Sequence, residues 1–203
     1  MMGKTHLFIG AASALACAAP YTKEGCLAAI IGGTVGGIIS DIDIKSKPTK
    51  MMALGIVAVS LLVDWIVDGG ILAYMRNCNR ENLLIGICLF MILCVIGAFQ
   101  DHREFTHSLF ALCLFSFSVG LFCRPVFPAF AVGFASHILL DILNKKPLRL
   151  FFPSQKGVCL RLCYADKTAD KIFLTLGMLG TGICLAYAVF TIVYPMVSPM
   201  LPF

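Results

Sequence analysis

The sequence predicts an all-α fold, a polytopic transmembrane helix bundle of about six to seven segments. Of its 203 residues, 59% are hydrophobic and only 13% are charged, about half the charged fraction of an ordinary soluble domain. The hydrophobic residues lie in runs long enough to enter or cross a membrane. No polar linker or low-complexity tract divides the chain, so we expect residues 1–203 to form a single integral-membrane domain.

Seven apolar runs account for the expected helices. A backbone within hydrocarbon must satisfy its own hydrogen bonds, which makes helix the expected conformation of each run. The first two runs are short for a span of about 20 residues. We expect them to be tilted, to pack deep inside the bundle, or to form a re-entrant pair. The runs cover residues 7–19, 25–40, 51–74, 83–99, 106–123, 126–143 and 172–196.

Small residues within the runs indicate packing rather than chemistry. The second run carries four glycines whose spacing lets a neighbouring helix approach closely, and their pattern does not match a phosphate-binding P-loop. The ten cysteines are dispersed without a C-x-x-C pair, so we expect them to act as small hydrophobes rather than as zinc or redox motifs. The four glycines are Gly32, Gly33, Gly36 and Gly37.

Two carboxylates lie in the third run. Asp64 and Asp68 are four residues apart and share one helix face. A carboxylate within a membrane segment is by default a functional hypothesis. However, Asp68-Gly69-Gly70 is typical of an early helix end near water. We therefore favour a structural or solvated role for both aspartates.

Histidine and aspartate fall at the ends of the apolar runs, in a pattern that predicts one shared site. If every run crosses the membrane, the N-terminus and the ends of the second, fourth and sixth runs lie on the same side. A re-entrant first pair removes two crossings and leaves this parity unchanged. The side chains at these places are those of His6, Asp41, Asp43, His102, His107, His137 and Asp141. We therefore expect a metal site at one membrane face.

The basic residues predict the orientation of this face. Of the 16 lysines and arginines, only Lys23, Arg76, Arg80 and Arg124 lie on the opposite side, and the other twelve lie on the ligand side. Because cytoplasmic loops carry an excess of lysine and arginine, the N-terminus and the metal site are predicted to be cytoplasmic. The C-terminus is then outside.

The residue types and spacings favour a transition metal. Imidazoles and carboxylates without thiolates suit zinc first, and manganese or iron as alternatives. Seven candidates exceed one tetrahedral shell, so we expect one to three ions, with some residues orienting the ligands. His137 and Asp141 share a helix face. His102 and His107 do not, and fit better across a helix break after which Thr106 caps the next helix.

These residues favour hydrolysis of a phosphoester. A divalent ion can activate water, and the Arg103 guanidinium matches the geometry of phosphate oxygens. We therefore assign catalytic roles to Arg103 and Asp43. At a membrane face the expected substrate is a lipid or a lipid-linked phosphoester, and no motif indicates nucleic-acid binding. The alternative is a non-enzymatic membrane protein, either a metal transporter or a structural or regulatory component. The sequence does not predict the oligomeric state.

Four short motifs resemble those of the YdjM-type (DUF457) membrane-bound metal-dependent hydrolases. They occur in the order typical of that family: Gly-Lys-Thr-His at 3–6, Asp-Ile-Asp at 41–43, His-Arg-Glu-Phe-Thr-His-Ser at 102–108 and Ser-His-Ile-Leu-Leu-Asp at 136–141. The Leu-Phe-Phe-Pro at 150–153 is similar to an apolar-proline element of the same family. The resemblance implies a helical protein of the bacterial inner membrane with hydrolase activity. A more distant likeness to zinc-dependent phospholipases C implies a multinuclear zinc site.

The chain departs from the family pattern at two positions. Ile44 follows Asp43 where the family often has histidine, which removes one potential ligand. Glu104 follows Arg103 where the family usually has glycine. The core ligand motifs are retained.

Overall fold

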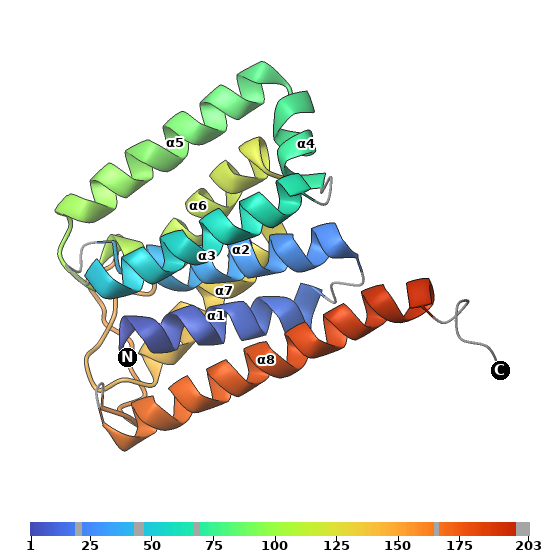
Figure 1. Cartoon of the computed structure of the whole chain (residues 1–203). Coiled ribbons are helices and arrows are strands. Elements are labelled where there is room, and N and C mark those ends of the chain that lie inside the picture. Colours follow the sequence, from blue (N-terminus) through green and yellow to red (C-terminus); the bar gives the residue numbers. More distant parts are fainter. Residues whose placement is uncertain (19–21, 43–46, 67–69, 165–166, 198–203) are drawn as a thin grey trace.

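The computed structural model describes residues 1–18, 22–42, 47–66, 70–164 and 167–197, and helices dominate this part of the chain. Its only β-structure within these ranges is two isolated bridges, Asn144 with Cys163 and Leu148 with Val158. The all-α prediction is therefore confirmed. The helices, drawn in Figure 1, are α1 (Gly3–Ala18), α2 (Lys23–Ile39), α3 (Lys47–Ile66), α4 (Gly70–Asn77), α5 (Arg80–Phe99), the 3₁₀ turn η1 (Phe105–His107), α6 (Leu109–Phe122), α7 (Phe127–Ile142) and α8 (Thr168–Val197).

Three helices are long and apolar enough to cross a membrane: α3 over Pro48–Ile66, α5 over Arg80–Phe99 and α8 over Thr168–Tyr194. At most 22% of each apolar window is buried inside the protein. Large hydrophobic side chains such as Phe99 and Ile183 are exposed on these helices. Such surfaces are stable against lipid rather than water. The helices α6 and α7 are also apolar but shorter.

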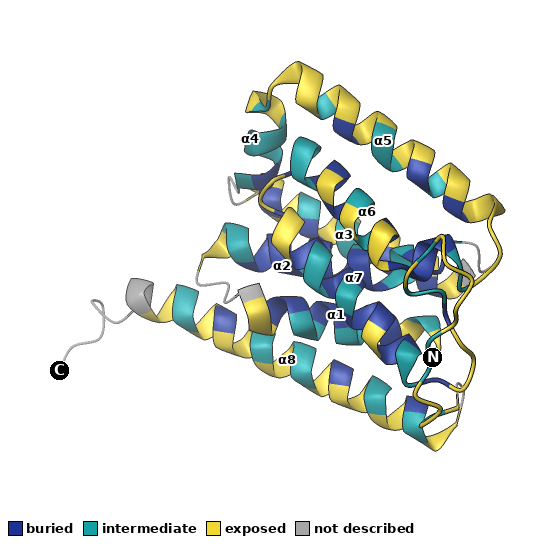
Figure 2. Cartoon of the chain, turned by 180° about the vertical axis from the view of Figure 1, so that it is seen from behind, coloured by how far each residue is buried: buried dark blue, intermediate teal, exposed yellow. Residues whose placement is uncertain are grey.

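The shorter helices lie inside this frame. Figure 2 shows that buried residues concentrate on α1, α2 and α7, whereas α5 and α8 are mostly exposed. Of the three arrangements considered for the first two apolar runs, burial within the bundle is the one that the structure supports. Buried polar side chains such as Thr34 and His137 are thereby kept away from lipid.

The glycines of α2 permit the close packing predicted for them. A Cβ at Gly33 would lie 2.6 Å from the backbone oxygen of Gly10 in α1, and one at Gly32 would lie 2.6 Å from the nitrogen of Phe130 in α7. Gly37 faces α1 and Gly36 faces α7 in the same way. One glycine pair therefore serves each side of α2, which brings three helix backbones together.

The third apolar run is two helices rather than one. The helix α3 ends at Ile66 and α4 begins at Gly70. Asp64 is almost fully buried, and its carboxylate accepts hydrogen bonds from the backbone nitrogens of Ile71 (3.3 Å) and Leu72 (2.9 Å). Asp64 thus satisfies free N–H groups at the start of α4, which is the structural role predicted for it. Asp68, which the sequence places on the same helix face, lies outside the described residues.

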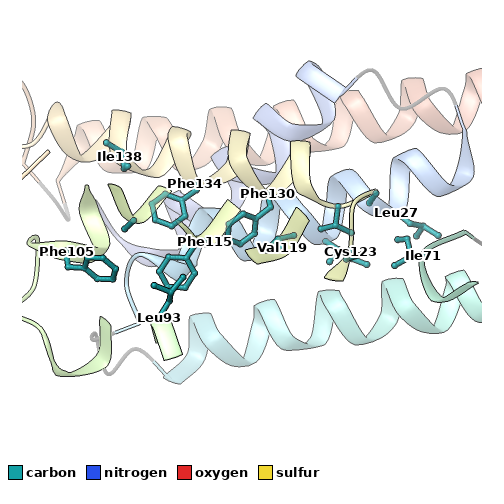
Figure 3. Packing of buried hydrophobic residues seen from close by; sticks show 14 residues of the cluster. Leu27, Ile71, Leu93, Phe105, Phe115, Val119, Cys123, Phe130, Phe134 and Ile138 are labelled. Atoms are coloured by element: carbon teal, nitrogen blue, oxygen red, sulfur yellow. The ribbon is translucent and has the colours of Figure 1, made fainter. Parts of the chain in front are cut away.

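A row of apolar side chains forms the main core between these helices. Figure 3 shows it extending along the bundle from Phe105 to Ile71, with Phe115, Phe130 and Phe134 between them. These three phenylalanines are at most 1% exposed. All ten cysteines are free thiols. The core therefore rests on hydrophobic packing without disulfides.

Candidate metal centre

Five predicted ligand residues converge at one end of the bundle. His6 lies in the first turns of α1, Asp41 follows the end of α2, His107 closes η1, and His137 and Asp141 lie in the second half of α7. Each is at most 8% exposed. Two carboxylates and three imidazoles thus share a buried volume that four separate segments of the chain enclose.

The polar atoms in this cluster are spaced like the ligands of a metal ion. Nε2 of His107 lies 3.2 Å from Nε2 of His137, 3.4 Å from Oδ2 of Asp141 and 3.5 Å from Oδ1 of Asp41. Nε2 of His6 lies 3.4 Å from Oδ1 of Asp141. Most of these separations are long for hydrogen bonds. They match the spacing of about 3.3–3.4 Å between two ligands that each lie about 2.0–2.1 Å from a tetrahedral zinc ion.

Two overlapping groups of three residues, which share His137, are alternative places for an ion. One comprises His6, His137 and Asp141, and the other comprises Asp41, His107 and His137. Within each group the ligand atoms all lie within 4.8 Å of one another. The set contains nitrogen and oxygen but no sulfur, which fits zinc, manganese or iron rather than a structural cysteine site.

The end of α2 fixes the ring of His137. Nδ1 of His137 lies 2.8 Å from the carbonyl oxygen of Gly37 and donates to it. This oxygen is free because the nitrogen of Asp41, its partner in a continued helix, bonds instead to the oxygen of Ile38. The contact leaves the lone pair on Nε2, which is the nitrogen that faces the other ligands.

A different arrangement from the predicted one fixes His107. Ser108, not Thr106, caps α6, because its Oγ accepts a hydrogen bond of 3.0 Å from the nitrogen of Ala111. Thr106 lies two residues too early, within η1, for this role, and its Oγ1 lies 3.1 Å from Nδ1 of His107. Thr106 therefore orients the imidazole, and Nε2 of His107 again faces the cluster.

The electrostatics of the cluster favour a cation. Burial raises the pKa of Asp41, but the rings of His137, His107 and His6 outweigh it and bring this pKa well below its usual range. Burial lowers the pKa of His107, but hydrogen bonds to Asp141 and Asp41 outweigh this effect and raise the pKa. The C-terminal ends of α2 and α7 add partial negative charge here. The carboxylates are therefore held in their ionised form, whereas burial and the neighbouring His6 lower the pKa of His137 to about 3 and keep its ring neutral.

Arg103 borders the cluster in a left-handed backbone conformation, with φ of 74°. Its Nη1 donates to the carbonyl oxygen of Lys146 at 2.8 Å, and its Nη2 lies 3.3 Å from Oδ2 of Asp141. The following Glu104, where the family usually has glycine, forms a 2.7 Å ion pair with Arg149. The loop after α7 thus holds the turn that carries Arg103.

The apolar-proline element at residues 150–153 braces the same turn. The ring of Phe152 packs edge-on against the ring of Phe105, with centroids 5.7 Å apart. The carbonyl oxygen of Leu150 accepts a hydrogen bond of 3.0 Å from the nitrogen of Leu109, at the start of α6. These contacts fix the position of η1 between the loop and α6.

Two of the seven predicted ligands are not part of either group. His102 is exposed, and its ring lies edge-on to that of His107 with centroids 5.0 Å apart. Asp43 lies outside the described residues. The amino group of Met1, which was not among the predicted residues, lies 3.0 Å from Oδ1 of Asp141. No residue pattern in the sequence signals this contact.

Comparisons with known proteins agree with the motifs. The chain is similar to the uncharacterized protein YvsG of Bacillus subtilis (strain 168), with 27% identity over 164 residues that cover 80% of this chain and 79% of YvsG. No solved structure matches the chain. The family model described as YdjM inner membrane protein matches residues 1–200. Together with the three apolar helices and the order of the four motifs, this match identifies the chain as a member of the YdjM inner membrane protein family.

Proposed function

We propose that this protein is a membrane-bound metal-dependent hydrolase that cleaves a lipid or lipid-linked phosphoester at the cytoplasmic face of the membrane. The observation that carries the proposal is the convergence of five buried histidine and aspartate side chains at one end of a membrane helix bundle. Burying carboxylates and imidazoles in a membrane protein costs free energy, so their presence there indicates a function.

The proposed cofactor is zinc, with manganese or iron as alternatives. His137 limits how the ions are shared. Its Nδ1 is held by the Gly37 carbonyl, so a single nitrogen remains and His137 can ligate one ion. The two overlapping groups that share His137 therefore cannot each hold an ion through it. A second ion would need a bridging carboxylate, for which Asp41 and Asp141 have the necessary two oxygens.

When bound, such an ion supplies Lewis acidity and makes water a nucleophile near neutral pH. The chain itself supplies the groups that position a phosphoester. Arg103 is 11% exposed and its Nε, which is buried, has no hydrogen-bond partner in the described part of the chain. This nitrogen can donate to a phosphate oxygen, since guanidinium matches phosphate geometry. Asp43 remains the second proposed catalytic residue, beside Arg103.

The place of the cluster supports a lipid substrate. Its residues lie at helix ends, where lipid headgroups meet a membrane protein. The neighbouring loop carries Lys145, Lys146 and Arg149. Basic side chains at this level attract anionic headgroups.

Metal analysis combined with a hydrolysis assay tests the proposal. Purified protein is expected to contain a transition metal and to release product from at least one phospholipid in a vesicle panel. Loss of a residue that merely orients a ligand costs about 10–100-fold. His107→Ala and Asp141→Ala should therefore each lower metal affinity and activity by more than about 100-fold. Asp101 is exposed and precedes His102, so Asp101→Ala is the matched control and should change neither the metal affinity nor the activity.

Two results would reject the proposal: protein purified without transition metal, or hydrolysis that persists in the double variant His107→Ala/Asp141→Ala. The rival hypothesis of a metal transporter predicts ionisable groups distributed along a path near the bilayer midplane. The described ligand groups instead gather at one bundle end. Metal uptake into proteoliposomes that His137→Ala abolishes would favour the transporter.

A further inference from the structure

A second feature, separate from the polar cluster, is an apolar cavity of about 290 Å³ that is lined by residues of the helices α2 to α7. Every lining side chain is a hydrocarbon, a thioether or a thiol. The volume is many times the roughly 10–15 Å³ that one water needs, and a cavity without polar partners does not hold ordered water. The cavity therefore suits an apolar occupant. Its walls include Ile31, Val35, Leu61, Phe90, Val119 and Phe130.

The surrounding helices put the cavity at hydrocarbon depth. Leu61 belongs to α3 and Phe90 to α5, two of the three helices long and apolar enough to cross a membrane. Val119 and Phe130 belong to the core row that Figure 3 shows. In this setting an extended peptide segment would leave its backbone polar groups unsatisfied, which disfavours it as the occupant. A hydrocarbon chain has no such cost.

One face of α2 connects the cavity to the polar cluster. Ile31 and Val35 line the cavity, Ile39 continues the same face at a step of four residues, and Ile42 follows in the turn after α2. Ile42 adjoins Asp41 of the cluster. At 1.5 Å per residue, the helical stretch from Ile31 to Ile39 is about 12 Å long, and the turn to Ile42 extends it. This length is close to the thickness of one leaflet, about half of a 30 Å hydrocarbon core.

The direct route through the core is closed. Phe115 on α6 and Phe134 on α7 lie, along their helices, between cavity-lining residues and the cluster ligands, and neither is exposed. By contrast, Val35 and Ile39 are only partly buried. A chain that reaches from the cluster to the cavity therefore passes along the half-buried side chains of Val35 and Ile39 on α2.

We infer that the cavity holds one hydrocarbon chain of the lipid whose phosphoester group lies at the metal centre. The inference rests on the proposed function, because that function places the headgroup beside Asp41. It adds how the substrate is selected: the protein recognises a lipid with a chain that spans a leaflet, rather than a free phosphoester.

Photo-crosslinking in vesicles tests this inference without relying on turnover. The probe is a phosphatidylglycerol with a diazirine near the end of one acyl chain, and crosslinked residues are mapped by mass spectrometry. Wild-type protein should be labelled at the cavity walls, including Val119 and Phe130. Val119→Trp fills the cavity and should lower this labelling about tenfold, equivalent to about 1.4 kcal/mol. Phe117→Trp, at a 59% exposed position of the same helix, should leave it unchanged.

A second variant guards against misfolding. If Val119→Trp does not elute as a single species in detergent, Ile31→Trp blocks the cavity from α2 and should have the same effect. Cavity labelling that neither substitution lowers, or labelling confined to exposed residues of α5 and α8, would overturn the inference.

The inactive double variant His107→Ala/Asp141→Ala separates the two proposals. It should lose hydrolysis and keep cavity labelling, since its substitutions are remote from the cavity. Hydrolysis with cavity labelling that Val119→Trp leaves intact would reject the chain site and keep the hydrolase. Suppose instead that the wild-type protein hydrolyses no phosphoester but its cavity is labelled, and that Val119→Trp lowers this labelling. This result would reject the hydrolase and keep the lipid chain in the cavity.

Discussion

At the scale of single residues, two clustered histidines have one ring nitrogen committed to the protein. Nδ1 of His137 bonds to the Gly37 carbonyl, and Nδ1 of His107 contacts the Thr106 hydroxyl. In metal sites such contacts fix the tautomer and orientation of the ring and raise its basicity as a ligand. Thr106 is thus a positioning residue for the candidate centre, although its side chain has no carboxylate or imidazole.

Substitution of Thr106 tests this role. Thr106→Val keeps the shape of the side chain but removes the hydroxyl, so Nδ1 of His107 loses its 3.1 Å partner. We expect the metal affinity to fall about 10–100-fold, the usual cost of losing a group that orients a ligand. Competition with a metal chelator, monitored by metal content, measures the change.

Thr106→Ser is the matched control, because it restores a hydroxyl at the same position and should recover most of the affinity. If the branched shape of Thr106 mattered instead of its hydroxyl, the valine variant would keep the metal affinity and the serine variant would lose it. If valine retains metal and serine releases it, His107 is not oriented in this way.

The spacing of residues predicts some of these relations and not others. His137 and Asp141 share a face of one regular helix, so their pairing follows from the sequence. His102 and His107 flank a break, and which one enters the cluster depends on the 3₁₀ turn at Phe105–His107. Thr106 and Ser108 are both capping residue types. Only the backbone path decides that Ser108 caps α6 and Thr106 contacts His107.

At the scale of elements, Asp64 shows how a carboxylate in a membrane helix can be structural. It accepts two backbone hydrogen bonds at the start of α4. The sequence predicts a break near Asp68-Gly69-Gly70. It does not predict that a residue before the break caps the helix after it, because this contact requires the two helices to fold against each other.

Asp64→Ala should destabilise the protein by roughly 1–2 kcal/mol, the usual cost of removing a capping oxygen from buried N–H groups. The free energy of unfolding falls because the backbone nitrogens of Ile71 and Leu72 lose their hydrogen-bond acceptors. Thermal unfolding in detergent measures the change. Asp64→Asn keeps one of the two oxygens and should lose less. An alanine variant with an unchanged melting temperature would contradict the capping role.

At the scale of the whole molecule, long and short helices have different tasks. The long helices α3, α5 and α8 bury at most 22% of their apolar windows and present a hydrophobic surface to lipid. The short helices α1, α2 and α7 pack closely through glycine. Four of the five clustered ligands lie on these helices or, for Asp41, in the turn after α2. Shortness is thus compatible with a membrane protein, because these helices have protein rather than lipid as their surroundings.

The apolar runs of the sequence predict this helical membrane fold because every residue type in a run contributes to the same signal. They do not predict which runs are central. Central and peripheral helices are equally apolar here, and the difference lies in the glycines at 32, 33, 36 and 37, whose packing partners are chosen by the tertiary fold.

The final prediction concerns the orientation of the molecule. Twelve of the 16 lysines and arginines lie on the side of the ligand cluster if each apolar run, or all but the first two, crosses the membrane. The positive-inside rule then places the cluster in the cytoplasm and Phe203 outside. Alkaline phosphatase, which is active only outside the cytoplasm, should therefore be active when fused after Phe203, and a fluorescent reporter that matures only in the cytoplasm should be dark there. Fusions after Lys146, in the loop that holds Arg103, should give the opposite pattern. Cytoplasmic signals at both positions would require an even number of crossings between them, which the single long helix α8 cannot provide.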